Sequence, residues 1–345
     1  MSFIAALALT TVLGPSPGLR PIHLPPPPMV CFPAEAPPSI DATSWMVWSV
    51  QHDAELGSFN PDTPRAIASI TKLMTAILVV DRAALSNQVV ISANADATPI
   101  GYIGQPDVRQ GETWSVRDLL ANILVQSGND AAVALAEHVS GDVTTFVGLM
   151  NQRADSLGMT NTSFVNPNGL DSEGHFSTAR DLIYLGRAAL AYPDVLRIAR
   201  IKHIRFDPGG RPIEVDATNR DLGIFPGLFG LKTGDTLAAS QVLLSYDEAP
   251  RGDYIAVVLG SRNRRSATRE ILAWSRTTLG PRDYFFAAAA GTDLELSFPD
   301  WYITRIRAAG TLPVGTTGPA QRTPLTDSLD QAFRVLLPGV LGGES

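Results

Sequence analysis

Apolar and polar residues alternate along this chain in a pattern that predicts strands, then a block of helices, then strands again. Residues 45–50 and 55–59 flank a turn-forming segment and predict a β-hairpin. Apolar residues then recur with helical spacing across residues 69–191. Strand patterns return after Tyr192, at residues 202–206, 213–217, 239–246 and 254–259, and a final helix is expected over 266–279. This order predicts an α+β fold, in which an antiparallel sheet and a helical insert enclose a cleft.

Three short polar motifs interrupt this pattern: Ser69-Ile70-Thr71-Lys72, Ser127-Gly128-Asn129 and Lys232-Thr233-Gly234. Each is weak alone, because the first is commonly a solvated helix face, the second an ordinary helix N-cap and the third an edge-strand charge. Together, in this order and with these gaps, they indicate an active-site serine enzyme that uses lysine as its base.

The helical spacing around the first motif explains its chemistry. Ser69 lies at or near a helix N-terminus, and Lys72 follows one turn later on the same face, ahead of the apolar stripe Leu73, Ala76, Ile77 and Val80. A serine hydroxyl is a poor nucleophile until a base takes its proton, and burial or nearby cations can lower the pKa of a lysine enough for that task. The helix N-terminus favours negative charge that develops on an attacked carbonyl.

The other two motifs are predicted at the rim of the cleft. Ser127 and Asn129 lie at a break between helical segments 118–125 and 131–140. The third motif is predicted at the start of a strand that continues into the 239–244 segment. A glycine such as Gly234 in an edge strand lets a ligand approach the backbone.

With these motifs the chain resembles the serine D-alanyl-D-alanine carboxypeptidases, the low-molecular-weight penicillin-binding proteins. The similarity extends through residues 68–76, 124–132, 164–182 and 230–234, and covers roughly residues 42 to 275. It implies a β-lactamase/transpeptidase-like α+β fold, with a mainly antiparallel sheet flanked by helices beside an all-helical subdomain.

The resemblance implies a role for each residue of the first two motifs. Ser69 attacks the penultimate D-Ala carbonyl of a peptidoglycan stem peptide and becomes acylated, with Lys72 as the general base. Ser127 relays a proton to the leaving D-Ala amine, and Asn129 holds the substrate amide. Water then releases the acyl-enzyme, and β-lactam antibiotics acylate Ser69 as substrate mimics.

The resemblance also implies a site for the terminal carboxylate. Lys232 and Thr233 bind it through charge-assisted contacts, and Gly234 belongs to the same strand. The backbone N–H groups of Ser69 and Asp235 form the oxyanion hole. Arg265 is the candidate for a further arginine near the carboxylate, with Arg262, Arg264 and Arg269 as close rivals and a solvated basic turn as the other interpretation.

Asp235 departs from the family pattern, because many relatives carry His or Tyr at this position. Its backbone role is independent of the side chain. Its carboxylate, however, lies near a site meant for another carboxylate, and like charges repel. We therefore expect Asp235 to weaken the binding of free D-Ala-D-Ala ends or to tune the pH dependence.

Composition narrows the chemistry further. The formal net charge of −7 argues against nucleic acid as a partner. Cys31 is the single cysteine, so neither an intrachain disulfide nor a cysteine metal cluster can form. The five histidines show no metal-binding spacing, and His175 is interpreted as structural. No metal or other cofactor is expected.

Four regions are predicted along the chain. Residues 1–14 form an apolar segment of signal-peptide length without a preceding positive charge, and residues 15–41 form a proline-rich linker. Residues 42–279 are predicted as the catalytic domain, and 280–345 as a small C-terminal extension, preferably a cap packed on that domain. The extension ends without a basic cluster, so membrane attachment has weak support. With the resemblance, the chain is expected to be exported and extracytoplasmic, in the envelope or periplasm of a bacterium.

Three other functions would use similar residues. A class A β-lactamase needs a glutamate for deacylation, in a Glu-x-x-Leu-Asn loop, and Glu173 in segment 162–174 lies outside such a pattern. A D,D-endopeptidase that cuts peptidoglycan cross-links uses closely similar chemistry and stays open. A catalytically weak peptidoglycan-binding protein that keeps the cleft is the other alternative.

Overall fold

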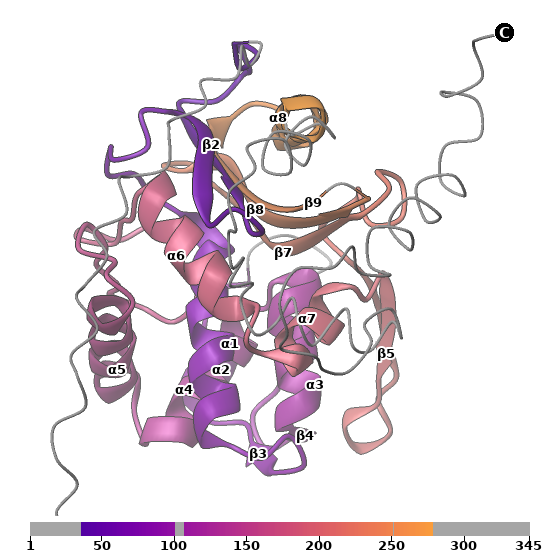
Figure 1. Ribbon diagram of the computed structural model, residues 1–345. Coiled ribbons are helices and arrows are strands. Elements are labelled where there is room, and N and C mark those ends of the chain that lie inside the picture. Colours follow the sequence, from indigo (N-terminus) through magenta and orange to yellow (C-terminus); the bar gives the residue numbers. More distant parts are fainter. Residues whose placement is uncertain (1–35, 101–106, 251, 279–345) are drawn as a thin grey trace, which may run out of the picture. The chain divides into compact units, whose positions relative to one another are not determined.

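A five-stranded antiparallel sheet organises the part of the chain that the computed structural model describes, residues 36–100, 107–250 and 252–278. The strand order is β2-β1-β9-β8-β7, so the first and last parts of the domain meet in the centre of the sheet (Figure 1). The strands are β1 (Ser44–Ser49), β2 (Ala54–Phe59), β7 (Leu228–Thr236), β8 (Ser240–Ala249) and β9 (Gly252–Ser261). β7 forms one edge, which leaves one side of it available to a ligand.

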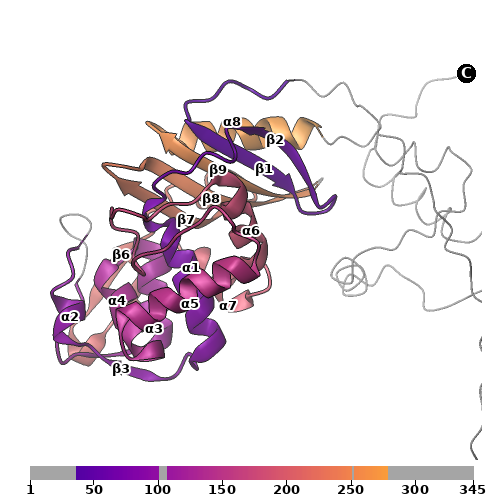
Figure 2. The same ribbon diagram turned by 90° about the vertical axis from the view of Figure 1, so that its left-hand side faces the viewer.

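The two faces of the sheet are covered by different helices, as Figure 2 shows. On β1, Trp45 and Val47 face α8 (Arg264–Thr278), and Met46 between them belongs to the larger core on the opposite side. This alternation follows from the two-residue period of a strand. α6 (Ala179–Ala189) packs on that opposite face against β1, β8 and β9.

The helical region lies beyond α6 and is built around α4 (Asn129–Ser140), which contacts α1, α2, α3 and α5. Four alanines of α4 are buried, and their small side chains allow close approach on several sides. The remaining elements are α1 (Thr71–Arg82), α2 (Ala93–Asp96), α3 (Val116–Ala121), α5 (Val143–Ser156), α7 (Pro193–Ala199), the 3₁₀ turns η1 (Ala68–Ile70) and η3 (Pro208–Gly210), the π-helical turn η2 (Asn122–Gln126), and two small hairpins, β3 (Gln88–Val90) with β4 (Thr113–Ser115) and β5 (His203–Phe206) with β6 (Ile213–Asp216).

The predicted α+β architecture is confirmed, including the first hairpin and the final helix. The prediction that the third motif starts a strand was wrong. The motif lies in the second half of β7, which already begins with apolar residues at Leu228 and ends at Thr236. Residues 240–249 form the next strand, which turns back antiparallel to β7. The chain reverses here through a short turn that ends at Ser240, a residue with φ of 55°.

The terminal predictions are outside the described residues. They comprise the signal segment 1–14, nearly all of the linker 15–41 and the extension 280–345. Among the helices that the structure describes, none is long and apolar enough to cross a membrane.

The close packing of α6 on the sheet predicts opposite effects of the same substitution on two helices. A Cβ on Gly186 of α6 would lie 2.9 Å from Ile255 Cγ2, whereas a Cβ on Gly148 of α5 would meet nothing within 4 Å. Gly148→Ala should therefore raise the free energy of unfolding by about 0.5–1 kcal/mol through helix propensity. Gly186→Ala should lower it by about 1–3 kcal/mol through overpacking. Urea unfolding measures both, and stabilisation by both substitutions would contradict the packing described here.

Candidate active site

Ser69 and Lys72 come together because a 3₁₀ turn runs directly into a helix. Ser69 is the middle residue of η1, and Lys72 is the second residue of α1. Lys72 Nζ lies 2.9 Å from Ser69 Oγ. The apolar face of α1 packs in the helical core. The first turn of the helix, including Lys72, is therefore buried as well.

The amine of Lys72 is enclosed by three oxygen atoms. Besides Ser69 Oγ, Nζ lies 2.7 Å from Asn129 Oδ1 and 2.5 Å from the carbonyl oxygen of Asn168. The Asn129 amide is oriented by its own Nδ2, which donates to the Pro99 carbonyl at 2.9 Å. Asn129 Oδ1 and Asn168 O can only accept hydrogen bonds. A neutral amine would use its two N–H groups on these oxygens, and its lone pair would then point to the Ser69 hydroxyl.

Burial makes this neutral form accessible near neutral pH. The side chain of Lys72 is fully enclosed, and the loss of hydration lowers the pKa of its amine from 10.5 to about 7. The carboxylate of Asp130 opposes this shift weakly. Asp130 is itself buried and accepts from the backbone N–H groups of Val108 and Ala131. Lys72 therefore has the pKa that a general base needs at physiological pH.

The second motif is a tight turn between two helices. Ser127 ends the π-helical turn η2 with a left-handed backbone, φ 78°, and Asn129 begins α4. Gly128 between them leaves room for the buried Asn122 side chain, because a Cβ there would lie 2.0 Å from Asn122 Oδ1. The turn directs Asn129 to Lys72 and leaves Ser127 half-buried.

The third motif closes the site from the edge of the sheet. Lys232 is buried, and its Nζ donates to the Thr233 carbonyl at 2.8 Å. Its pKa is lowered well below the usual value, by burial first and then by the nearby Lys72 and Arg264. Gly234 lies against the nucleophile, because a Cβ on it would approach Ser69 N to 2.9 Å. The glycine is required here by close approach of two backbones.

Thr218 joins the second and third motifs and was missed from the sequence. Its backbone N–H donates to the Val125 carbonyl of η2 at 2.9 Å, and its Oγ1 lies 2.6 Å from Thr233 Oγ1 on β7. It lies in the connection between β6 and β7, where the sequence shows no motif.

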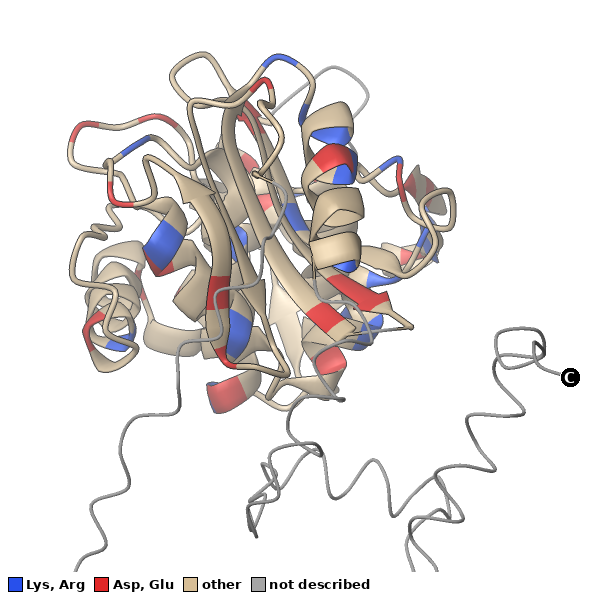
Figure 3. Ribbon diagram, turned by 45° about the horizontal axis from the view of Figure 1, so that its top comes forward, with Lys and Arg blue, Asp and Glu red and all other residues tan. Residues whose placement is uncertain are grey.

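Of the four arginines of α8, coloured blue in Figure 3, Arg276 binds Asp247, and the other three divide between Asp221 and the third motif. Arg265 lies 2.9 Å from Asp221 Oδ1, and Arg269 binds the same buried carboxylate. Arg264 instead donates to the Gly234 carbonyl at 3.0 Å and lies 3.7 Å from Asp235 Oδ2. Arg264 is therefore the arginine that reaches the third motif, and the side chain of Arg265 is directed to Asp221.

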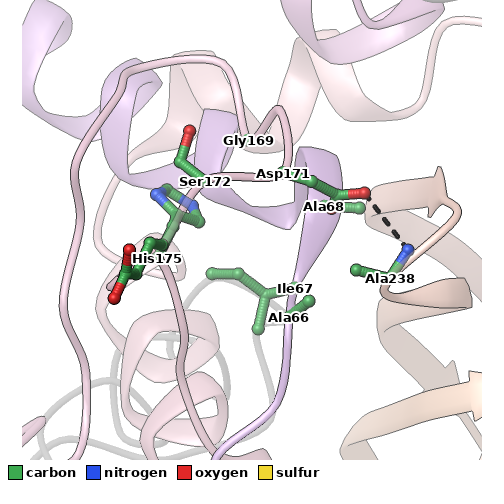
Figure 4. Close-up of a pocket in the computed structure, with 9 residues that line it drawn as sticks. Ala66, Ile67, Ala68, Gly169, Asp171, Ser172, His175 and Ala238 are labelled. Carbon is green, nitrogen blue, oxygen red and sulfur yellow. Dashed lines mark hydrogen bonds between the residues drawn. The ribbon is translucent and has the colours of Figure 1, made fainter.

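A loop across residues 164–176 lies against the nucleophile segment. Asn168 O binds Lys72, as described above, and a Cβ on Gly169 would lie 2.0 Å from the Ala68 carbonyl oxygen. A cavity of about 330 Å³ lies beside this contact (Figure 4). Across it, Asp171 Oδ2 accepts from the Ala238 N–H at 3.1 Å, drawn as the dashed line. The cavity is lined by Ala66, Ile67, Ala68, Gly169, Asp171, Ser172, Glu173, His175 and Ala238.

Within the described ranges, no group of three or more His, Cys, Asp or Glu side chains is placed to hold a metal ion.

The geometry agrees with comparisons to known proteins. The model of the D-alanyl-D-alanine carboxypeptidase family, peptidase family S11, matches residues 32–263. The chain belongs to this family. It is 35% identical over 259 residues to D-alanyl-D-alanine carboxypeptidase DacC of Escherichia coli, a match that covers 69% of this chain and 62% of that relative. The chain thus spans less than two thirds of the length of the curated carboxypeptidases it matches first.

Two other relatives extend the comparison. The crystal structure of penicillin-binding protein 6B from Escherichia coli is 32% identical, with a TM-score of 0.65 over 70% of this chain and 80% of that one. A D-alanyl-D-alanine endopeptidase of Escherichia coli is 40% identical over 157 residues, which are 45% of this chain and 50% of the relative.

The lowered pKa of Lys72 predicts how its removal changes stability with pH. In the unfolded chain the amine has a pKa near its usual value, so between pH 7 and 10 the unfolded state binds more protons than the folded state. The wild type should then gain stability relative to Lys72→Met as pH rises, by up to about 1.4 kcal/mol per pH unit. Urea unfolding of both proteins at pH 7 and pH 9 measures the difference. A difference that stays constant would mean that Lys72 keeps its ordinary pKa.

Proposed function

We propose that this protein is a serine D-alanyl-D-alanine carboxypeptidase that removes the terminal D-Ala from peptidoglycan stem pentapeptides. The observation that carries the proposal is the placement of a buried amine of pKa about 7 at 2.9 Å from Ser69 Oγ. Two acceptor oxygens occupy the N–H groups of that amine, so its lone pair serves Ser69. Membership of the carboxypeptidase family supports the substrate class.

In the acylation step, Lys72 takes the proton of Ser69 Oγ as this oxygen forms a bond to the penultimate D-Ala carbonyl carbon. The oxyanion is assigned to the backbone N–H groups of Ser69 and Asp235, and the close approach of Gly234, the residue before Asp235, to Ser69 N supports this assignment. The C–N bond then breaks, and Ser127 relays the proton to the leaving D-Ala amine. Water attacks the resulting ester while Lys72 takes a proton from it; the bond from the acyl carbon to Ser69 Oγ then breaks, and Lys72 returns the proton to Oγ.

The terminal carboxylate is assigned to the end of β7. Lys232 and Thr233 supply a buried amine and a hydroxyl there, and Asn129 is assigned to the substrate amide. We assign the additional arginine to Arg264 in place of Arg265, because Arg264 alone among the α8 arginines contacts Gly234 and Asp235. Asp235 pairs with this arginine and so competes with the substrate carboxylate for it.

The wider setting follows from the same proposal. Residues 42–279 are the catalytic domain, peptidoglycan stem peptides are the substrates, and β-lactams acylate Ser69 covalently. The protein acts outside the cytoplasm, where peptidoglycan is exposed. A D,D-endopeptidase is the second candidate, supported by the relative of that name that is 40% identical over part of the chain.

Labelling with a fluorescent penicillin tests the proposal directly. Wild type should gain the mass of one penicillin, and Ser69→Ala should gain none, because the acyl-enzyme forms on Ser69 Oγ. Slow return of the free enzyme separates a penicillin-binding protein from a β-lactamase. Release of D-Ala from a pentapeptide, compared with cleavage of a cross-linked dimer, separates the carboxypeptidase from the endopeptidase. Absence of both adduct and D-Ala release would favour a binding protein without catalysis.

A matched pair of substitutions tests the assignment of the arginine. Arg264→Gln should raise the KM for a carboxylate-ended peptide by about 10-fold or more, because a charge-assisted contact is lost. Arg265→Gln, one position along the same helix, should change KM by less than about 3-fold, because it loses contacts to Asp221 and the Arg220 carbonyl and none to the third motif. Asp235→Asn should lower KM in the wild type, and in Arg264→Gln it should lower KM only through the loss of like-charge repulsion, because the competition for Arg264 is then absent. Equal effects of the two arginine substitutions would return the assignment to Arg265.

A further inference from the structure

A buried hydrogen-bond chain leads from the 164–176 loop to the peptide bond that precedes the nucleophile. His175 Nδ1 accepts from the backbone N–H of Val165 at 3.1 Å, so Nε2 carries the proton of the neutral ring. Nε2 lies 2.7 Å from Thr71 Oγ1, and this hydroxyl lies 2.8 Å from the Ala68 carbonyl oxygen. Each atom has one role: the imidazole donates to Thr71, and Thr71 donates to Ala68.

Both donor residues are held in these roles by burial. Thr71 is fully buried and His175 is 6% exposed, and Phe164 packs edge-on against the imidazole. Burial lowers the pKa of His175 to about 4, so the ring is neutral at physiological pH. A chain of this kind is fully satisfied and therefore rigid.

The residue at the end of the chain has an unfavourable backbone. Ala68 has φ of 47°, in the left-handed region that alanine rarely adopts. Such a conformation persists only where its surroundings impose it. Three contacts hold its carbonyl: the Thr71 hydroxyl, the Thr71 backbone N–H, and the close approach of Gly169.

A peptide unit is planar, so its C=O and its N–H point in opposite directions within one plane. The carbonyl of Ala68 and the N–H of Ser69 belong to the same unit. Fixing the Ala68 carbonyl therefore fixes the direction of the Ser69 N–H. Under the proposed function, that N–H is one of the two donors of the oxyanion hole.

We propose that His175 and Thr71 are positioning residues, which set the Ser69 oxyanion donor by hydrogen-bonding the carbonyl on the other side of its peptide plane. They touch neither substrate nor reacting atoms. The inference deepens the proposed function and rests on it, and it gives His175 a role in the reaction in addition to a structural one.

Thr75 provides a matched control on the same helix. It is fully buried, lies one turn after Thr71, and its Oγ1 donates at 2.7 Å to the Pro167 carbonyl of the same loop. Thr71→Val and Thr75→Val thus each remove one buried hydroxyl bond, and we expect similar losses of thermal stability. Only Thr71→Val disconnects the Ala68 carbonyl from His175.

The experiment measures the rate constant of acylation by a chromogenic cephalosporin in wild type, Thr71→Val, Thr71→Ser and Thr75→Val. We expect Thr71→Val to slow acylation by about 10- to 100-fold, because the oxyanion donor is misplaced. Thr71→Ser should restore the rate, and Thr75→Val should stay within about 3-fold of wild type. The acidic limb of the pH profile should remain near pH 7 in all four, because the base is unchanged. Equal slowing by the two valine substitutions, or no rescue by serine, would overturn the proposal.

A second measurement is independent of catalysis. The backbone amide resonance of Ser69 in a ¹⁵N-labelled protein should move in Thr71→Val and return in Thr71→Ser. It should also move in His175→Leu, although this residue is far from Ser69 in the sequence. An unchanged resonance would overturn the inference even if penicillin labels Ser69. A lack of labelling with the resonance shifted as expected would instead count against the proposed function.

Discussion

The removal of the Lys72 amine from water is the physical constraint on which this site depends. In water the amine would keep its ordinary pKa and stay charged, unable to accept a proton from Ser69. Desolvation is the largest cause of the shift and requires complete enclosure. Four separate segments build the enclosure: α1 itself, the start of α4, the 164–176 loop and β7. A lysine base therefore needs both the helical region and the sheet to enclose it, whereas a solvated catalytic residue would not need such enclosure.

Close approach of these segments depends on the absence of side chains at three positions. Gly128 leaves room for Asn122, Gly169 rests on the Ala68 carbonyl, and Gly234 rests on the Ser69 N–H. A methyl group at any of them would enter space already filled by another segment. The segment of Ala68 and Ser69 thus packs between the 164–176 loop and β7. This packing maintains the left-handed backbone conformation of Ala68. The unfavourable backbone conformation of Ala68 is offset by the packing of the loop and β7 around it, as expected where the geometry of a site must be rigid.

The buried charged residues of the site differ in whether they have a partner of opposite charge. Lys72 and Lys232 are both buried, and Lys72 disfavours the charged form of Lys232. Within the described residues, Lys232 has no carboxylate partner, and its Nζ donates to the Thr233 carbonyl. A substrate carboxylate would complete such an arrangement. Asp221, in the connection between β6 and β7, has the opposite role, because it is buried and binds two arginines of α8.

The sequence by itself determined the fold class and the elements that carry the three motifs. Periodicity predicted the first hairpin, the helix after Ser69 and the α+β order, because strand and helix periods are local properties of the chain. Helical spacing was also sufficient to place Lys72 one turn from Ser69. The position of the third motif within its strand was not predicted correctly. A turn after Thr236 separates β7 from β8, whereas the sequence pattern suggested one continuous strand from the motif onward.

The tertiary structure alone decided what depends on contacts between distant segments. Asn168, Thr218 and the His175–Thr71 chain join the site through bonds that span many residues, and no local pattern marks them. The choice between Arg264 and Arg265 is of the same kind. Neighbouring residues of a helix point about 100° apart, so one arginine faces β7 and the other faces Asp221. The pKa of Lys72 belongs here too, since burial is a property of the assembled segments and of no single one.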